Sequence, residues 1–150
     1  MKDNFSTQAA EYAIYRPTYP DNLYDFLFKL VSQKDAAWDC ATGNGQVASV
    51  LAQHFQHVYA TDISEKQLSQ ALPLPNVVYK VESSDQVKVT DQSFDLITVA
   101  QAIHWFNFDA FYSEVKRTLK PNGIIAVIGY GLMSIDKKVD QVIYKLYEEI

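Results

Sequence analysis

The hydrophobic positions of this 150-residue chain fall into short segments with two alternating periods. Short, nearly continuous apolar runs predict strands at 36–40, 57–63, 76–82, 93–102 and 123–131. Apolar residues at helical spacing predict helices at 46–55, 64–72 and 106–119, and a last helix from 136 onward. Because strands and helices alternate, the pattern predicts an α/β fold with a doubly wound, mostly parallel sheet covered on both faces.

Local signals predict how some of these segments begin and end. Ser64 followed by Gln67 has the spacing of a capping box at a helix start. The run "PNG" at 121–123 predicts a turn before the last strand. Two more helical segments, at about 3–15 and 20–33, precede the first strand and are joined by "RPTYP", whose prolines favour an extended turn. We therefore expect an N-terminal helical cap at 1–35 and a cofactor-binding core at 36–150.

The stretch "WDCATGNGQVASV" at 38–50 places a glycine loop between a predicted strand and a predicted helix. Gly43, Gly45 and Ala48 satisfy the dinucleotide pattern G-x-G-x-x-G/A. Asp62 lies about 20 residues beyond the loop, at the end of the next predicted strand, where an acid binds ribose hydroxyls. Loop and acid together predict a nucleoside cofactor at the carboxyl ends of the strands.

Asp39 bears on which nucleoside the loop holds. An acid at the end of the first strand would repel a pyrophosphate, whereas it would attract a sulfonium cofactor with a free amino group. A nicotinamide-dependent oxidoreductase therefore explains the glycine loop and Asp62 but leaves Asp39 unexplained. A second alternative is a catalytically silent module that keeps the cofactor fold without turning over an acceptor.

Several motifs, in order along the chain, resemble class I S-adenosylmethionine (SAM)-dependent methyltransferases. The frame Asp39-x-Ala41-x-Gly43-x-Gly45 resembles their D-x-G-x-G-x-G motif, with Ala41 in place of the first glycine. "YATDIS" resembles the second motif, and "DQSFDLITVAQAIHWF" and "VKRTLKPNGIIAVIGY" resemble the segments around the fourth and fifth strands. "AEYAIYRPTYP" is similar to the type 11 subgroup, which includes trans-aconitate methyltransferase-like and embryo-abundant methyltransferase-like proteins.

The resemblance implies a Rossmann-like fold, SAM as the cofactor and no metal. It implies that Ser83 stands where the family often has an acid facing the adenine amino group, and that Ser84 offers its backbone N–H to the ring. The cofactor-binding residues that it implies are Asp39, Ala41, Gly43, Gly45, Asp62, Ile63, Ser83, Ser84 and Ala100.

The segment "AQAIHWF" should lie at the same end of the sheet and form the acceptor side. His104 is the candidate general base, because its unperturbed pKa lies near neutrality; the alternative is a packing or orienting role. Gln101 and Trp105 are candidate acceptor-binding residues, and Arg16 would pair with a carboxylate. The resemblance favours methyl transfer to a small molecule, with a carboxylate as the preferred acceptor.

Composition narrows the partners and the location. The formal net charge is −5 and the Lys and Arg residues form no cluster, which disfavours nucleic acid as a direct partner. No apolar run reaches the roughly 18–20 residues that span a bilayer, and no signal peptide is recognisable. The single cysteine, Cys40, fits a reducing compartment and a buried, inert thiol, so we expect a cytoplasmic protein without membrane partners.

The segment at 123–131 should form an exposed edge of the sheet. The methyltransferase fold normally adds two further strands after its fifth, and these are not in this sequence. An apolar edge strand favours pairing with another chain. We therefore expect either a fragment of a longer protein or a homo-oligomer that covers this edge.

Overall fold

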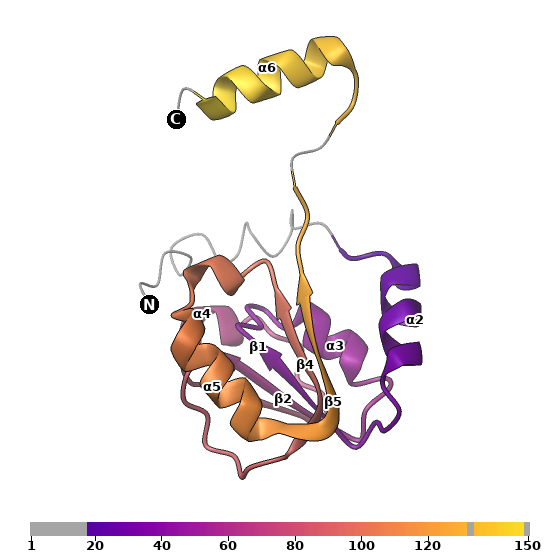
Figure 1. The fold of residues 1–150 in the computed structure, drawn as a ribbon, viewed down its shortest axis with the longest axis vertical. Coiled ribbons are helices and arrows are strands. Elements are labelled where there is room, and N and C mark those ends of the chain that lie inside the picture. Colours follow the sequence, from indigo (N-terminus) through magenta and orange to yellow (C-terminus); the bar gives the residue numbers. More distant parts are fainter. Residues whose placement is uncertain (1–17, 132–133, 149–150) are drawn as a thin grey trace.

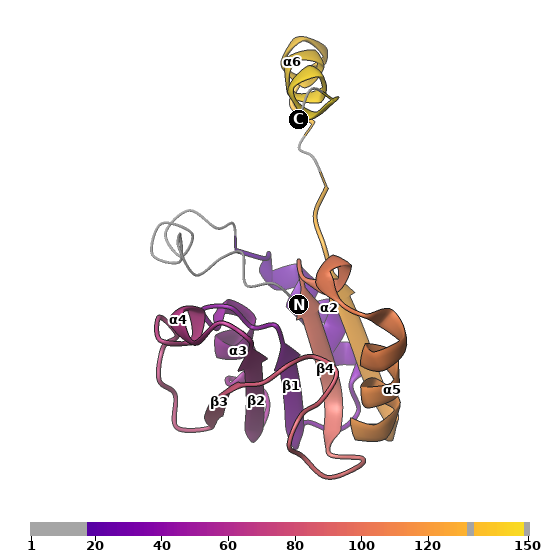
Figure 2. The same ribbon diagram turned by 90° about the vertical axis from the view of Figure 1, so that its left-hand side faces the viewer.

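The structure is a computed structural model, and it describes residues 18–131 and 134–148. One parallel sheet forms its centre, with the strand order β3-β2-β1-β4-β5 (Figures 1 and 2). The strands are β1 (Ala36–Cys40), β2 (His57–Asp62), β3 (Val77–Val81), β4 (Phe94–Ala100) and β5 (Leu119–Ile128). The order reverses at β1 and β4, so the carboxyl ends of these two strands form the topological switch point at which open α/β sheets bind ligands.

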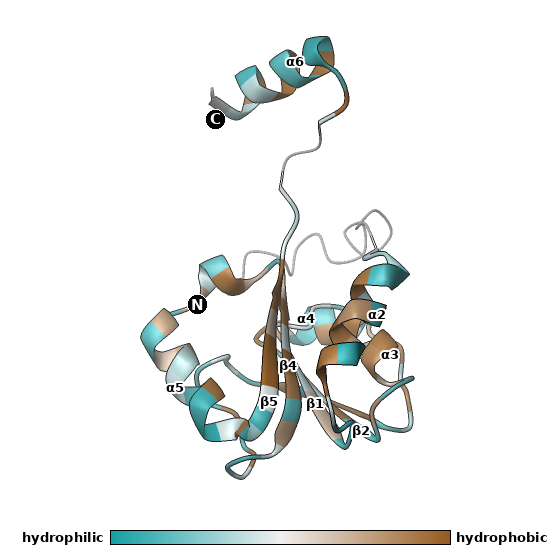
Figure 3. Cartoon of the chain, turned by 45° about the vertical axis from the view of Figure 1, so that its right-hand side comes forward, coloured by the Kyte–Doolittle hydropathy of each residue, from teal (hydrophilic) through white to brown (hydrophobic). Residues whose placement is uncertain are grey.

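Helices cover both faces of the sheet, which confirms the predicted Rossmann-like, doubly wound architecture. Figure 3 shows α2 and α3 on one side of the sheet and α5 on the other. The helical elements are α2 (Asp21–Leu30), α3 (Gln46–Leu51), α4 (Glu65–Leu68), the 3-10 turn η1 (Ile103–Trp105), α5 (Phe108–Thr118) and α6 (Lys137–Glu148).

Two apolar clusters, one on each face of the sheet, hold these layers together. Leu96 of β4 joins Phe28 and Leu51 in the cluster under α2 and α3. The next residue, Ile97, faces the other way, into the cluster of Trp38 and Phe111 under α5. This alternation along strands buried on both faces explains why β4 reads as a continuous apolar run.

The helices are present where the pattern predicts them, but several are shorter. α3 ends at Leu51 and the chain continues in turns, in which Phe55 still donates its N–H to the Leu51 carbonyl at 2.9 Å. α4 ends at Leu68, soon before the prolines at 73 and 75. Its predicted cap is confirmed, because the Ser64 hydroxyl accepts the N–H of Gln67 at 3.3 Å.

The predicted turn at 121–123 is wrong. β5 runs through these residues, and the extra chain is absorbed as an irregularity: Phe94 pairs with Leu119, whereas Leu96 pairs with Ile124. A proline is tolerated here because β5 is an edge strand. Gly123 lies so close to β4 that a Cβ at this position would be 2.9 Å from the Phe94 carbonyl oxygen.

The β5 edge and α6 expose apolar side chains. Val127 of β5 is 47% exposed, and Val142 of α6 is 70% exposed. Figure 1 shows α6 standing apart from the sheet. The first predicted helix, at 3–15, lies outside the described residues, and the second is α2. Within 18–131 and 134–148, no helix is long and apolar enough to cross a bilayer.

Candidate cofactor site

The glycine loop follows β1 at the switch point and turns through three left-handed residues. The φ angles are 56° at Ala41, 59° at Gly43 and 82° at Gly45. Glycine adopts this region without steric cost, whereas alanine does so at a cost of about 1 kcal/mol. The loop therefore keeps the predicted glycine-type conformation at Ala41 despite the methyl group. A Cβ on Gly45 would also lie 2.8 Å from the Tyr79 hydroxyl.

Asp39 fixes the loop to the sheet from inside. Its side chain is buried, and its carboxylate accepts hydrogen bonds from the hydroxyls of Thr42 in the loop and Thr98 on β4, the latter at 2.8 Å. Asp39 thus connects β1, β4 and the loop at the switch point of the sheet.

Asp62 fixes the same loop from the next strand. One carboxylate oxygen accepts the N–H of Gly43 and the other accepts the N–H of Ser64, each at 2.9 Å. A carboxylate oxygen has two acceptor positions and can accept more than one hydrogen bond. This arrangement supports the ribose-binding role predicted for Asp62.

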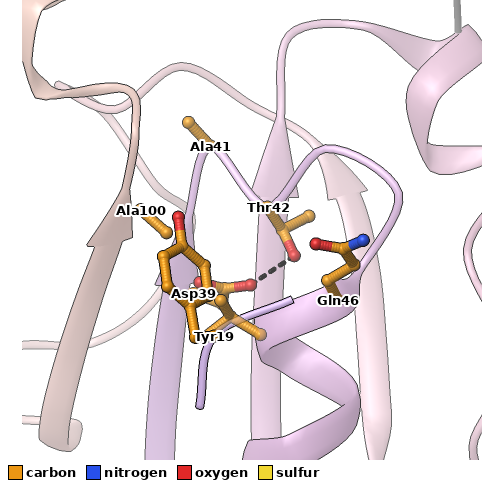
Figure 4. Close-up of a pocket in the computed structure, with 7 residues that line it drawn as sticks. Tyr19, Asp39, Ala41, Thr42, Gln46 and Ala100 are labelled. Carbon is orange, nitrogen blue, oxygen red and sulfur yellow. Dashed lines mark hydrogen bonds between the residues drawn. The ribbon is translucent and has the colours of Figure 1, made fainter. Parts of the chain in front are cut away.

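A small cavity lies between the loop and the ends of β1 and β4 (Figure 4). Its volume is about 10 Å³. The structure brings three predicted residues together in its wall, Asp39, Ala41 and Ala100. The other lining residues are Tyr19, Thr42, Gln46 and Val47. Thr42 and Gln46 were not among the residues predicted for this site, although both are polar and lie within or beside the glycine loop.

The segment after β3 adds a carboxylate that the sequence reasoning also missed. The Ser83 hydroxyl donates a hydrogen bond to Asp85, and Ser84 is buried. Burial raises the pKa of the Cys40 thiol well above its ordinary value, and the carboxylates of Asp39, Asp62 and Asp85 raise it further. Both effects favour the protonated thiol over the thiolate, which is the reactive form.

The acceptor-side residues lie just beyond β4. Gln101 also has a left-handed φ, 54°. Its N–H donates to the carbonyl of Ile128, the last residue of β5, at 2.9 Å, and its side-chain amide donates to the carbonyl of Tyr130, just beyond the strand, at 3.3 Å. His104 and Trp105 follow on η1, with ring centroids 4.9 Å apart, and both are exposed. They do not line the small cavity, and Arg16 lies outside the described residues.

The chemistry of the cavity suits a ligand that donates hydrogen bonds. Among residues 18–131 and 134–148, its lining includes the carboxylate of Asp39 and the hydroxyls of Tyr19 and Thr42, and no lysine or arginine. The side-chain oxygen of Gln46 is buried and accepts no hydrogen bond from the residues that the structure describes. A buried acceptor without a donor is costly, so a ligand amino group fits this wall whereas a pyrophosphate does not. The described residues contain no group of three or more His, Cys, Asp or Glu that could hold a metal ion.

Comparison with known proteins agrees with this geometry. A family model described as "Methyltransferase domain" matches residues 38–127. A candidate methyltransferase of Dictyostelium discoideum is 39% identical over 99% of this chain and 58% of its own length. A methyltransferase-like protein of Schizosaccharomyces pombe is 29% identical over 83% of this chain and 50% of its own. The chain belongs to the methyltransferase-domain family, and it spans between a half and three fifths of the length of these relatives.

Solved structures show the same fold. A candidate type II methyltransferase from Anaeromyxobacter dehalogenans superposes with a TM-score of 0.79 at 38% identity, over 89% of this chain and 57% of that one. A phosphoethanolamine N-methyltransferase of Haemonchus contortus, solved with phosphoethanolamine and S-adenosylhomocysteine, gives a TM-score of 0.63 at 20% identity, over 83% of this chain and 31% of that one. At this identity the second structure bears on the fold alone.

Proposed function

We propose that this chain carries the SAM-binding half of a methyltransferase that transfers a methyl group to a small-molecule acceptor. One observation carries the proposal. The cavity with the hydrogen-bond acceptors Asp39 and Gln46 and the predicted ribose-binding acid, Asp62, both adjoin the glycine loop at the switch point of the sheet. Family membership supports the same cofactor.

The chain's own residues bind and orient. SAM supplies an activated methyl group on a positively charged sulfur, so the protein needs chiefly to position the acceptor and exclude water. Asp62 would accept the ribose hydroxyls while its bonds to Gly43 and Ser64 keep the carboxylate in place. Ala41, Gly45, Ile63 and Ala100 would form the wall along the cofactor. Ser83 and Ser84 would face the adenine, and the Ser83–Asp85 hydrogen bond adds an acid that can accept from an exocyclic amine.

The acceptor side is assigned from position. His104, just past β4, is the candidate general base for a hydroxyl or amine acceptor; a carboxylate acceptor is already ionised and would need only positioning. Gln101, Trp105 and Arg16 would contact the acceptor. Placement in the trans-aconitate methyltransferase-like subgroup, and with it a carboxylate acceptor, remains part of this proposal. So do a cytoplasmic location and a homo-oligomer formed through β5.

Two alternatives make different predictions. A nicotinamide-dependent oxidoreductase would place a pyrophosphate against Asp39 and the oxygen of Gln46, where like charge and an unmatched acceptor oppose it. A catalytically silent module would bind the cofactor normally and turn over no acceptor.

Calorimetric titration of the purified chain with S-adenosylhomocysteine, with NADH in parallel, tests the proposal. We expect micromolar affinity for S-adenosylhomocysteine and none for NADH. Binding of NADH alone would overturn the proposal. Methyl transfer from labelled SAM to a panel of small acids, alcohols and amines then separates an enzyme from a silent module.

A further inference from the structure

Gln46 is the amide side chain in the cavity wall, and its oxygen, which can only accept, has no hydrogen-bond donor among the described residues. The atom is buried, and Gln46 is the first residue of α3. Figure 4 shows the amide oxygen turned toward Thr42 and Asp39 and the amide nitrogen turned away. A buried carbonyl in this state costs free energy that a bound donor would recover.

Neither hydroxyl of the wall, that of Thr42 or that of Tyr19, donates a hydrogen bond to the Gln46 oxygen. Thr42 gives its proton to the carboxylate of Asp39. Two acceptors, the Gln46 oxygen and the Asp39 carboxylate, therefore belong to one cavity whose remaining wall includes the apolar side chains of Ala41, Val47 and Ala100.

The size of the cavity limits what can enter it. About 10 Å³ admits a single group the size of a water molecule. An ammonium group has that size, carries several N–H donors and is positively charged, so it matches both acceptors. A carboxylate or phosphate oxygen would lie against the negative charge of Asp39 and the Gln46 oxygen, and the Tyr19 hydroxyl is a donor on this wall that could oppose that repulsion.

We infer that Gln46 is a specificity-determining residue that selects the protonated amino group of the cofactor's amino-acid end. The inference rests on the proposed function. Gln46 would then contribute to the preference for nucleosides that carry an amino-acid group over nucleosides that lack its amino group.

The test compares two ligands and three proteins. S-adenosylhomocysteine and its analogue with hydrogen in place of the amino group are titrated into the wild-type chain, Gln46→Met and Gln53→Met. Methionine keeps the length of the side chain and removes the acceptor. Gln53 is exposed beyond the end of α3, so it provides the matched control.

We expect Gln46→Met to weaken S-adenosylhomocysteine about tenfold or more, as for a hydrogen bond to a charged donor, and to leave the deaminated analogue within about twofold. Gln53→Met should match the wild type for both ligands. The ligand-free Gln46→Met protein should be as resistant to urea as the wild type or more so, because it buries no unmatched carbonyl.

Three results would overturn the inference. Equal weakening of both ligands would mean that Gln46 acts through shape, and unchanged affinity for both would mean that a water fills the cavity. A loss of ligand-free stability with no change in ligand preference would indicate a structural role. Failure of the wild type to bind S-adenosylhomocysteine is a distinct result, because it overturns the proposed function itself.

Discussion

Two buried carboxylates at opposite ends of adjacent strands differ in how the chain satisfies them. Asp95, near the start of β4, accepts the N–H groups of Asp35 and Ala36 at 3.0 Å and forms an ion pair with Lys120 at 2.9 Å. Asp39, near the end of β1, accepts two hydroxyls, and in the cavity that it lines Gln46 keeps an acceptor without a donor.

The difference separates a structural end of the sheet from a binding end. At the amino end the chain supplies both backbone donors and a cation, so Asp95 holds β1, β4 and β5 together. At the carboxyl end the local hydrogen bonding is incomplete until a donor arrives. We infer that ligands bind at the end of the sheet where a hydrogen-bond acceptor lacks a donor. The opposite end, where the chain itself supplies the donors, stabilises the fold.

The largest expected effect lies at the structural end. Asp95→Ala leaves two backbone N–H groups and Lys120 without their acceptor, so the free energy of unfolding should fall by about 3 kcal/mol. Urea unfolding measures it. The affinity of the folded protein for S-adenosylhomocysteine should stay within about twofold of the wild type. A large loss of affinity would mean that the two ends are not independent.

Asp62→Ala should show the reverse pattern. Loss of the carboxylate removes charge-assisted bonds to the ribose, so affinity for S-adenosylhomocysteine should fall about 50-fold by calorimetry. The free energy of unfolding should fall by about 2 kcal/mol, less than for Asp95→Ala, because two loop N–H groups lose an acceptor but no ion pair is broken. An affinity equal to that of the wild type would remove Asp62 from the cofactor site.

Lowering the pH should destabilise the protein by protonating carboxylates that accept hydrogen bonds in the fold, such as Glu114. Hydrogen bonds from Arg117 lower the pKa of Glu114; burial opposes this shift, and the Val87 N–H adds to it. A carboxyl with a lowered folded pKa stabilises the protein above its unfolded pKa, about 4.3, and loses that contribution as the pH falls through the folded pKa.

Urea unfolding between pH 7 and 3 should therefore show stability falling once the pH drops below the unfolded pKa of a glutamate, about 4.3, with part of the loss due to Glu114. Glu114→Gln should be less stable at pH 7 and should show a shallower decline. The same slope in both proteins would assign the acid sensitivity to other carboxyls, of which Asp95 is one. Burial raises the pKa of Asp95, but hydrogen bonds from Ala36, Lys120 and Asp35 give a net lowering.

Much of the fold could be predicted because burial imposes a period on the sequence. β4 is buried along its whole length and gives an unbroken apolar run, and the order of loop, helix, strand and acid located Asp62. Helix ends were less certain, since α3 and its following turns share similar hydrogen bonds. The irregularity in β5 was missed because "PNG" has turn composition, whereas pairing with β4 determines its conformation.

The sequence motifs predicted several of the residues that line the candidate site, but not which side chains contact one another there. Ala41, Asp39 and Ala100 meet in one cavity as their motif positions imply. That the Gln46 oxygen is buried, or that Ser83 bonds to Asp85, depends on side-chain directions that spacing does not encode. Glu114 likewise meets the Val87 N–H from 27 residues away.

The smallest expected effect concerns the loop conformation itself. Ala41 and Gln92 both have left-handed φ angles, 56° and 52°, but only Ala41 lines the cavity. Replacing either with glycine should relieve backbone strain, and each variant should gain about 0.5–1 kcal/mol in urea unfolding. Affinity for S-adenosylhomocysteine should be unchanged in Gln92→Gly and within about threefold in Ala41→Gly, because the loop already has its bound shape. A loss of stability confined to Ala41→Gly would show that contacts of the methyl group in the cavity wall outweigh the strain. The alanine would then be part of the binding end rather than a tolerated departure from the glycine motif.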